Sequence, residues 1–148
     1  MTQFVLTAHV FFATLGFGMA IAFELLLVAV ARSQHVDAIR TAYSVAARYR
    51  PLIGLSLLLA ILLGFYLAMA GGYSLTAPWL LVSYAMIVVG GLTFGAFIQR
   101  RTRRILSLVA DSDAAMSEEL RSVTASVTPL AAVVLLIVMF VILGAMIR

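Results

Sequence analysis

The chain has 148 residues, of which 64% are hydrophobic and only 11% are charged. Soluble domains average about 45–50% apolar and about 25% charged residues, so this composition excludes a soluble globular domain and predicts a membrane protein. A membrane-crossing helix needs about 20 apolar residues. The chain therefore has room for at most four or five crossings, and we expect residues 1–148 to form a single membrane domain.

The chain has ten arginines, no lysine and six acidic residues, which gives a net charge of +4. In a soluble domain this balance would indicate a nucleic-acid partner. Here the arginines cluster at the ends of apolar runs, as they do beside membrane helices, so we expect no nucleic-acid partner. The absence of cysteine excludes a disulfide, a thiolate metal site and a cysteine nucleophile.

Four apolar runs follow one another along the chain, and none alternates with a period of two, so helices rather than barrel strands are predicted. The first run follows no basic residue and precedes no small-residue cleavage site, which favours a retained span over a signal peptide. The predicted fold is all-α, a polytopic four-transmembrane-helix bundle. Its spans are expected at about residues 4–31, 52–70, 79–98 and 130–147.

The two longer connections are predicted to be helical as well. Helical spacing runs from Val36 to Tyr49, and Pro51 suits the first turn of the second span. After the third span, Asp111 or Asp113 can cap a helix start. The residues that then recur at three- and four-residue spacing predict a cytoplasmic helical extension between the third and fourth spans; they are Met116, Leu120, Val123 and Val127.

Orientation follows from the arginines, because cytoplasmic loops retain positive charge. The connection 71–78 carries no charge, whereas the other two connections hold nine of the ten arginines. Both termini, including Arg148, are therefore expected outside. The four clustered residues Arg100, Arg101, Arg103 and Arg104 can contact anionic lipid headgroups or face Glu118 and Glu119.

Glu24 is the informative residue of the first span, because an intramembrane carboxylate costs about 2.5–3.5 kcal/mol on insertion scales. At 100° per residue it shares one face of the helix with His9, Gly16 and Ala20, so it is expected to face protein rather than lipid. Two interpretations remain open. Glu24 forms an ion pair with an arginine, for which Arg48, Arg50 and Arg100 are the candidates, or it takes part in proton- or ion-coupled transport.

His9 lies near the outer end of the first span, about 22 Å along the helix axis from Glu24, so the two residues form separate sites. It is either a haem or metal ligand or a histidine that hydrogen-bonds to a neighbouring backbone or hydroxyl. The other histidine, His35, lies at the opposite side of the membrane, so Met69 or Met146 is the candidate second haem ligand.

Small residues recur every fourth position in the second span, and Gly91 and Gly95 repeat this pattern in the third. They serve either packing inside one bundle or dimerisation. The sequence contains no phosphate-binding glycine loop, no HExxH and no GxSxG motif, so it gives no support for hydrolases or phosphotransferases of the soluble type, and catalysis is the weaker class of function.

The layout resembles a bacterial family of small predicted integral membrane proteins of unknown function. The likeness rests on Thr7-Ala8-His9-Val10, on Arg48-Tyr49-Arg50-Pro51, on the Gly-rich end of the second span and on Pro78-Trp79-Leu80. It covers nearly the whole chain and implies a fold and a membrane location.

A weaker similarity links the chain to four-span membrane protoporphyrinogen oxidases and copper-resistance membrane domains, which also place a histidine early in the first span. The resemblance implies that His9 matches the residue implicated in haem binding by the oxidases. The chain departs from them in having no lysine, which they carry in the third span.

We therefore expect a small integral protein of a bacterial inner membrane that acts as a structural, accessory or interaction subunit without a cofactor. Its partners are the lipid bilayer with its anionic headgroups and a second copy or a larger membrane complex. The alternatives are a redox protein that binds haem b or a metal through His9, and transport through Glu24.

Overall fold

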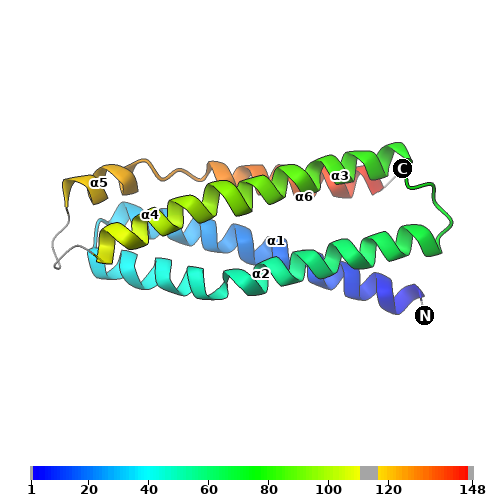
Figure 1. Cartoon of the computed structure of the whole chain (residues 1–148), viewed down its shortest axis with the longest axis horizontal. Coiled ribbons are helices and arrows are strands. Elements are labelled where there is room, and N and C mark those ends of the chain that lie inside the picture. The colour runs from blue at the N-terminus through cyan, green and yellow to red at the C-terminus, as the bar shows by residue number, and fades with distance from the viewer. Residues whose placement is uncertain (1, 111–116, 147–148) are drawn as a thin grey trace.

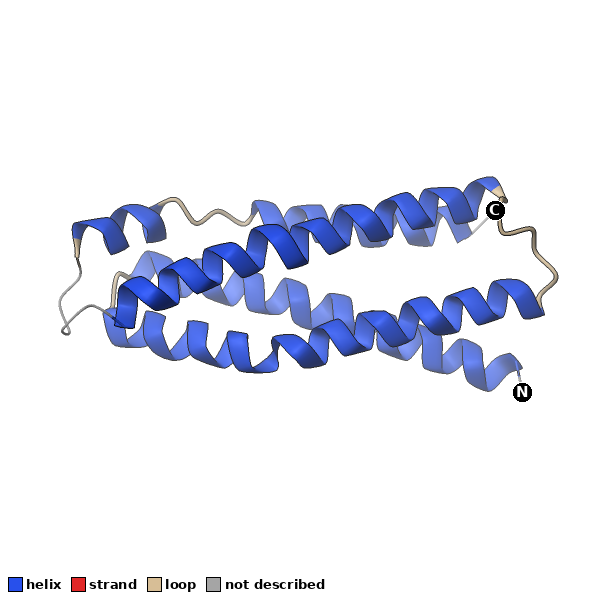
Figure 2. Ribbon diagram, viewed as in Figure 1, coloured by secondary structure: helices blue, strands red, loops and turns tan. Residues whose placement is uncertain are grey.

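The computed structural model describes residues 2–110 and 117–146, and the regular structure in these ranges is entirely helical (Figure 2). It contains four helices long and apolar enough to cross a membrane by length and composition. The prediction of an all-α protein with four membrane-length helices is thus confirmed. Several residues used in the sequence analysis lie outside the described ranges; these are Asp111, Asp113, Met116, Ile147 and Arg148.

Helices α1 (Thr2–Ser33) and α2 (Val36–Ala70) form an antiparallel pair that lies side by side along the bundle (Figure 1). Gln34 ends α1 with a left-handed backbone, φ 57°, a common way to terminate a helix. The side-chain amide nitrogen of Gln34 also donates a hydrogen bond to the carbonyl of Ala31 at 2.9 Å. This turn sends the chain straight back along α1.

Helix α2 runs through Pro51 without a break, so this proline lies inside the helix rather than in its first turn. A proline in a helix interior removes one backbone hydrogen bond. The buried face nevertheless continues on both sides, since Ile39, Tyr43 and Ala46 precede the proline and Ile53 follows it with helical spacing. Packing of this face keeps the helix continuous.

The third long helix has three parts: α3 (Pro78–Gly91), a π-helical segment η1 (Leu92–Ile98) and α4 (Gln99–Ala110). Gly72, at φ 69°, turns the chain between α2 and α3, and proline suits the first position of α3. In a π-helix each hydrogen bond spans five residues. Residues after η1 therefore lie at a different angle from those of an uninterrupted α-helix.

The remaining helices are the short α5 (Glu118–Ala125) and α6 (Leu130–Met146). The Ser117 hydroxyl caps α5 by accepting a hydrogen bond from the Leu120 amide at 3.1 Å. Helix α6 packs against α3 and α1, and α4 packs against α2 and α5. Helix α5 lies at the end of the bundle where α1 turns into α2 (Figure 1).

Two glycines allow α1 and α2 to approach closely. A Cβ atom at Gly16 would lie 2.7 Å from Leu57 Cδ2 and 3.2 Å from the Leu57 backbone nitrogen. A Cβ atom at Gly64 would lie 2.8 Å from Cε1 of the His9 ring. These small residues therefore serve packing inside the bundle, as small residues do between membrane helices.

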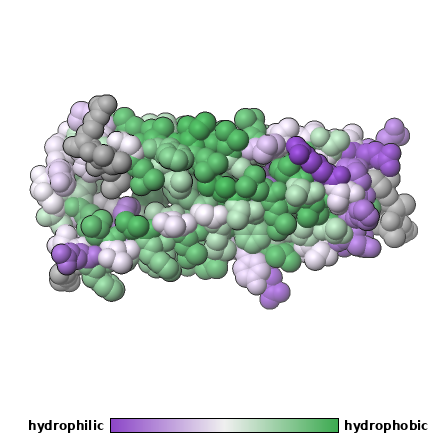
Figure 3. Space-filling model, turned by 180° about the vertical axis from the view of Figure 1, so that it is seen from behind, coloured by the Kyte–Doolittle hydropathy of each residue, from purple (hydrophilic) through white to green (hydrophobic). Residues whose placement is uncertain are grey.

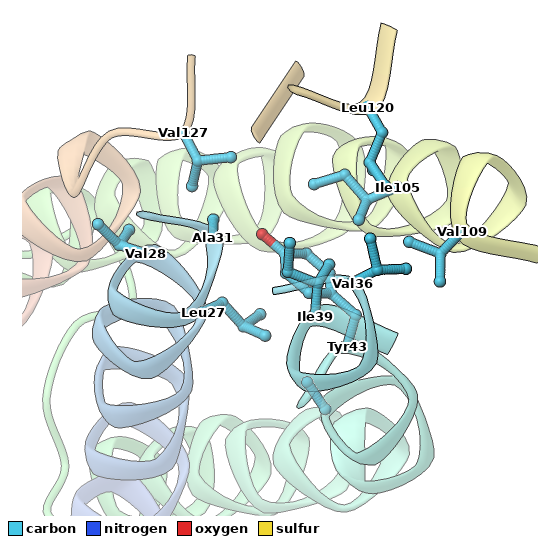
Figure 4. Close-up of a cluster of buried hydrophobic side chains, with 11 residues drawn as sticks. Leu27, Val28, Ala31, Val36, Ile39, Tyr43, Ile105, Val109, Leu120 and Val127 are labelled. Carbon is cyan, nitrogen blue, oxygen red and sulfur yellow. The ribbon is translucent and has the colours of Figure 1, made fainter. Parts of the chain in front are cut away.

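The buried apolar side chains form two clusters, which we call the end cluster and the middle cluster. In the end cluster, side chains from α1, α2, α4 and α5 point toward one another (Figure 4). Its members are Leu27, Val28, Ala31, Val36, Ile39, Tyr43, Ala46, Ile105, Val109, Leu120 and Val127. The middle cluster consists of Ala20, Ile53, Ile98, Ala131 and Leu135.

The surface is divided along the bundle axis into an apolar part and a hydrophilic part. Figure 3 shows apolar residues over the middle of the molecule and hydrophilic residues gathered mainly toward the end where α5 lies. Exposed large hydrophobic residues occur on all the long helices, as at Phe11, Leu62, Leu92 and Phe140. An apolar belt of this kind suits contact with lipid.

Gly16→Leu is expected to lower the free energy of unfolding by about 1–3 kcal/mol, because the added side chain overpacks the α1–α2 contact. The matched control is Gly18→Leu, since a Cβ atom at Gly18 meets nothing within 4 Å. Thermal unfolding in detergent micelles measures both variants. Equal losses in the two variants would contradict the close α1–α2 approach.

Candidate functional site

A layer of charged and polar side chains lies between the two apolar clusters. On α1, Glu24 follows Ala20 of the middle cluster and precedes Leu27 of the end cluster. On the third long helix, Arg101 lies in the same way between Ile98 and Ile105. The bundle thus brings one acid and one base to the same level, in a region where neither can be solvated freely by water.

Glu24 and Arg101 form a buried ion pair, in which Arg101 Nη2 donates to Glu24 Oε2. The Glu24 side chain is 3% exposed and that of Arg101 is 13% exposed. The Arg101 guanidinium also lies over the ring of Phe97, 5.7 Å from its centroid, which is a cation–π distance. The pair joins α1 to α4 and neutralises the carboxylate inside the bundle.

Arg50 extends the layer from α2. Its Nη2 donates to the Thr102 hydroxyl at 2.9 Å, and its guanidinium lies 5.8 Å from the centroid of the Phe94 ring. Arg50 also interacts electrostatically with Glu24 and with Arg101. Glu24 therefore lies in the field of two guanidinium groups, of which Arg101 forms the ion pair, and the layer carries an excess positive charge.

Tyr43 places a phenol near this layer. Its side chain is fully buried and interacts electrostatically with Arg101 and Glu24. Within residues 2–110 and 117–146, neither the Tyr43 hydroxyl nor Arg101 Nε has a hydrogen-bond partner. Leaving a buried polar group unpaired costs about 1–3 kcal/mol, so the layer is a polar cluster that is only partly satisfied by the described side chains.

The structure selects a partner for Glu24 that the sequence analysis did not name. Arg48 and Arg100 are exposed, and Arg50 bonds to Thr102. The partner is Arg101, one of the arginines expected at lipid headgroups. Its spacing gave a usable signal, because Arg101 lies three residues after Ile98 and four before Ile105, on one helical face.

The clustered arginines thus have different environments. Arg101 points inward, whereas Arg104 pairs with Glu119 across an exposed 3.5 Å contact. Arg100 and Arg103 are exposed. The side-chain amide of Gln99 is oriented so that its nitrogen donates to the Gly95 carbonyl at 3.1 Å. Its oxygen then accepts a hydrogen bond from Arg103 Nη2 at 2.8 Å.

His9 lies apart from this layer, against α2. Its Nδ1 is 2.7 Å from the carbonyl oxygen of Ala60, and because a carbonyl only accepts, Nδ1 carries the proton and donates. The ring also lies against Gly64. This geometry is the backbone hydrogen bond that was one of the two interpretations of His9, and it leaves Nε2 without a proton in the neutral ring.

Three hydroxyls in the long helices are satisfied locally. Ser56, Ser83 and Thr93 each donate to the carbonyl four residues earlier in their own helix. The described residues contain no group of three or more His, Cys, Asp or Glu side chains that could hold a metal ion. The hydroxyls therefore do not connect His9 to the charged layer.

Comparison with known proteins gives one match. Residues 3–148 match the model of a family described as "Predicted integral membrane protein (DUF2269)". The match covers nearly the whole chain and agrees with the resemblance seen in the sequence. Neither a curated protein nor a solved structure matches the chain.

Glu24→Gln and Arg101→Gln are each expected to lower the free energy of unfolding by about 3–5 kcal/mol, because each leaves one charge buried without its partner. The double variant should lose less than the sum of the two single losses, since it buries no unpaired charge. Unfolding of the four proteins in detergent gives this double-mutant cycle.

The exposed pair Arg104–Glu119 is the matched control, with side chains 65% and 60% exposed. Neutralising either residue there is expected to change stability by about 1 kcal/mol or less. Strictly additive losses for Glu24 and Arg101 would show that the two residues do not act as a pair.

Proposed function

The chain belongs to the DUF2269 family of predicted integral membrane proteins, and from this premise we propose that it is an interaction subunit of a bacterial inner membrane rather than an enzyme. The observation that carries the proposal is the outward-facing glycine pair of the third long helix. Gly91 and Gly95 are exposed, and a Cβ atom at either position would meet nothing within 4 Å.

These glycines differ from Gly16 and Gly64, which are occupied by α1–α2 packing. Packing inside the bundle therefore accounts for Gly16 and Gly64 but not for Gly91 and Gly95. The third long helix is also the most peripheral. In its most apolar stretch 11% of the residues are buried, compared with 22% to 28% in the other three helices. Small-xxx-small faces let two membrane helices approach closely.

We propose that Gly91 and Gly95 form the contact with a helix of a second copy or of another membrane subunit. Val88 and Leu92, which are 60% and 62% exposed, flank this face and supply apolar contact area. Because the chain is taken up by membrane-length helices, such a contact is the activity that its outer surface supports best.

The charged layer supports a structural role for Glu24 in this proposal. An intramembrane acid used for transport must exchange its proton or ion. Glu24 is instead bonded to Arg101 inside the bundle. The transport alternative has no comparable support, because the hydroxyls of Ser56, Ser83 and Thr93 are bonded within their own helices.

The orientation proposed for the subunit places both termini outside and the α5 end in the cytoplasm. Nine of the ten arginines belong to the connections that meet at this end, and such loops retain positive charge on the cytoplasmic side. The end cluster supports a cytoplasmic helical extension, because α5 contributes Leu120 to an apolar core shared with α1, α2 and α4.

Haem binding through His9 is the second candidate, favoured by the Nδ1 hydrogen bond to Ala60, which is typical of ligating histidines. Met69, the described candidate for the second axial ligand, does not fit this role. Met69 lies five residues after Gly64, about 140° around α2, and its side chain is 54% exposed, so it points away from His9. The side chain of Met146 is outside the described set.

The interaction proposal predicts a cross-link at the glycine face. The chain has no native cysteine, so Val88→Cys introduces a unique thiol on this face. In membranes treated with an added oxidant we expect a disulfide between the introduced cysteines of two copies, and Gly91→Leu or Gly95→Leu should abolish it because a large side chain keeps the helices apart.

Gly18→Leu and Gly144→Leu are the matched controls, since both glycines are outward-facing with nothing within 4 Å of a Cβ atom. They should leave the cross-link intact. A cross-link that survives Gly91→Leu and Gly95→Leu, or none at all with Val88→Cys, would overturn the proposed contact.

For the haem alternative, we expect no Soret band in protein purified in mild detergent after expression with ample haem, because Met69, the described candidate for the second axial ligand, points away from His9. An absorption spectrum measures this directly. A Soret band that disappears in His9→Ala would establish haem binding and replace this expectation.

A further inference from the structure

A shallow groove lies between η1 and α6. It has a volume of about 310 Å³ and is lined by Leu92, Thr93, Phe97, Leu130, Ala131 and Val134. The Thr93 hydroxyl donates to the Val89 carbonyl at 2.8 Å, so it offers no free hydrogen to the groove. The walls are therefore apolar along their length.

Phe97 is the lining residue that precedes the arginine cluster along the third long helix. Arg100 follows Phe97 by three residues, about 4.5 Å along the helix axis and on the same side of the helix. The Arg101 guanidinium lies over the Phe97 ring, so positive charge reaches the lining itself. An apolar channel that meets positive charge at one end matches the two parts of an anionic amphiphile.

Arg100 is the residue best placed to hold the anion. Arg101 is paired with Glu24, and Arg104 with Glu119. Arg100 is exposed and forms no ion pair among the described residues. Arg103, three residues further along α4, is exposed as well. Helix α4 thus carries four arginines, of which Arg101 and Arg104 are paired with Glu24 and Glu119.

We propose that this groove binds one anionic phospholipid, with an acyl chain between η1 and α6 and the phosphate on Arg100. The size of the groove favours an acyl chain over a protein helix. Its volume of 310 Å³ is at the lower end of small-ligand sites, whereas a helix with its side chains is a cylinder about 10–12 Å in diameter and needs a wider groove. The groove shares Leu92 with the edge of the Gly91–Gly95 face, but lipid binding does not depend on the contact proposed there.

Native mass spectrometry of the full chain in neutral detergent tests this site, with phosphatidylglycerol and phosphatidylcholine of identical acyl chains as probes. Phosphatidylglycerol should bind about fivefold or more tightly, since one arginine near a phosphate contributes about that factor. Arg100→Gln should remove this preference. Val134→Phe should weaken both lipids by filling the groove.

The controls are Arg48→Gln, an exposed arginine on α2, and Val133→Phe, the exposed neighbour of Val134 on α6. Both should bind as the parent chain does, and thermal unfolding verifies that each variant is folded. Equal affinity for the two lipids, or equal losses with Arg48→Gln and Arg100→Gln, would overturn the proposal in favour of general charge attraction. Co-purification of a protein that protects the groove from lipid would overturn it as well.

Discussion

The Glu24 side chain is 3% exposed, and keeping its carboxylate ionised without a cation beside it would cost several kcal/mol. Arg101 supplies that cation from α4, so the ion pair forms only when α1 and α4 have the correct relative position. Because each charge needs the other, neither helix can shift along the bundle without exposing an unpaired group. The ion pair thereby sets the register of the helices around it.

The two apolar clusters depend on this register. The middle cluster and the end cluster lie on opposite sides of the charged layer, and α1, α2 and the third long helix contribute to both. Helix α2 reaches both because it continues through Pro51. Gly16 and Gly64 then bring α1 and α2 together, so the bundle combines nonspecific apolar burial with one specific polar contact.

The site shows how far periodicity extends and where it stops. The wheel of the first span placed Glu24 on a face with Gly16 and Ala20, and all three are buried. The choice among arginines depends on the angle of α4 about its own axis. The π-helical segment η1 changes that angle relative to a continuous α-helix, so the helical pattern of α3 does not carry over to α4. The spacing of Arg101 with Ile98 and Ile105 is the one signal in the sequence that places it on the buried face. Tyr43 joined the site only through the folding of α2 against α4.

Sequence alone determined that this is an all-α protein with four membrane-length helices, because apolar length and helical periodicity are local properties. It also identified Glu24 as the residue that needs an explanation, since the cost of burying a carboxylate does not depend on the fold. Tertiary structure decided that Arg101 is its partner and that His9 bonds to Ala60. It also decided that Gly16 faces a neighbouring helix while Gly91 faces outward. These outcomes depend on the rotation and spacing of helices that lie far apart in the chain, which no local pattern encodes.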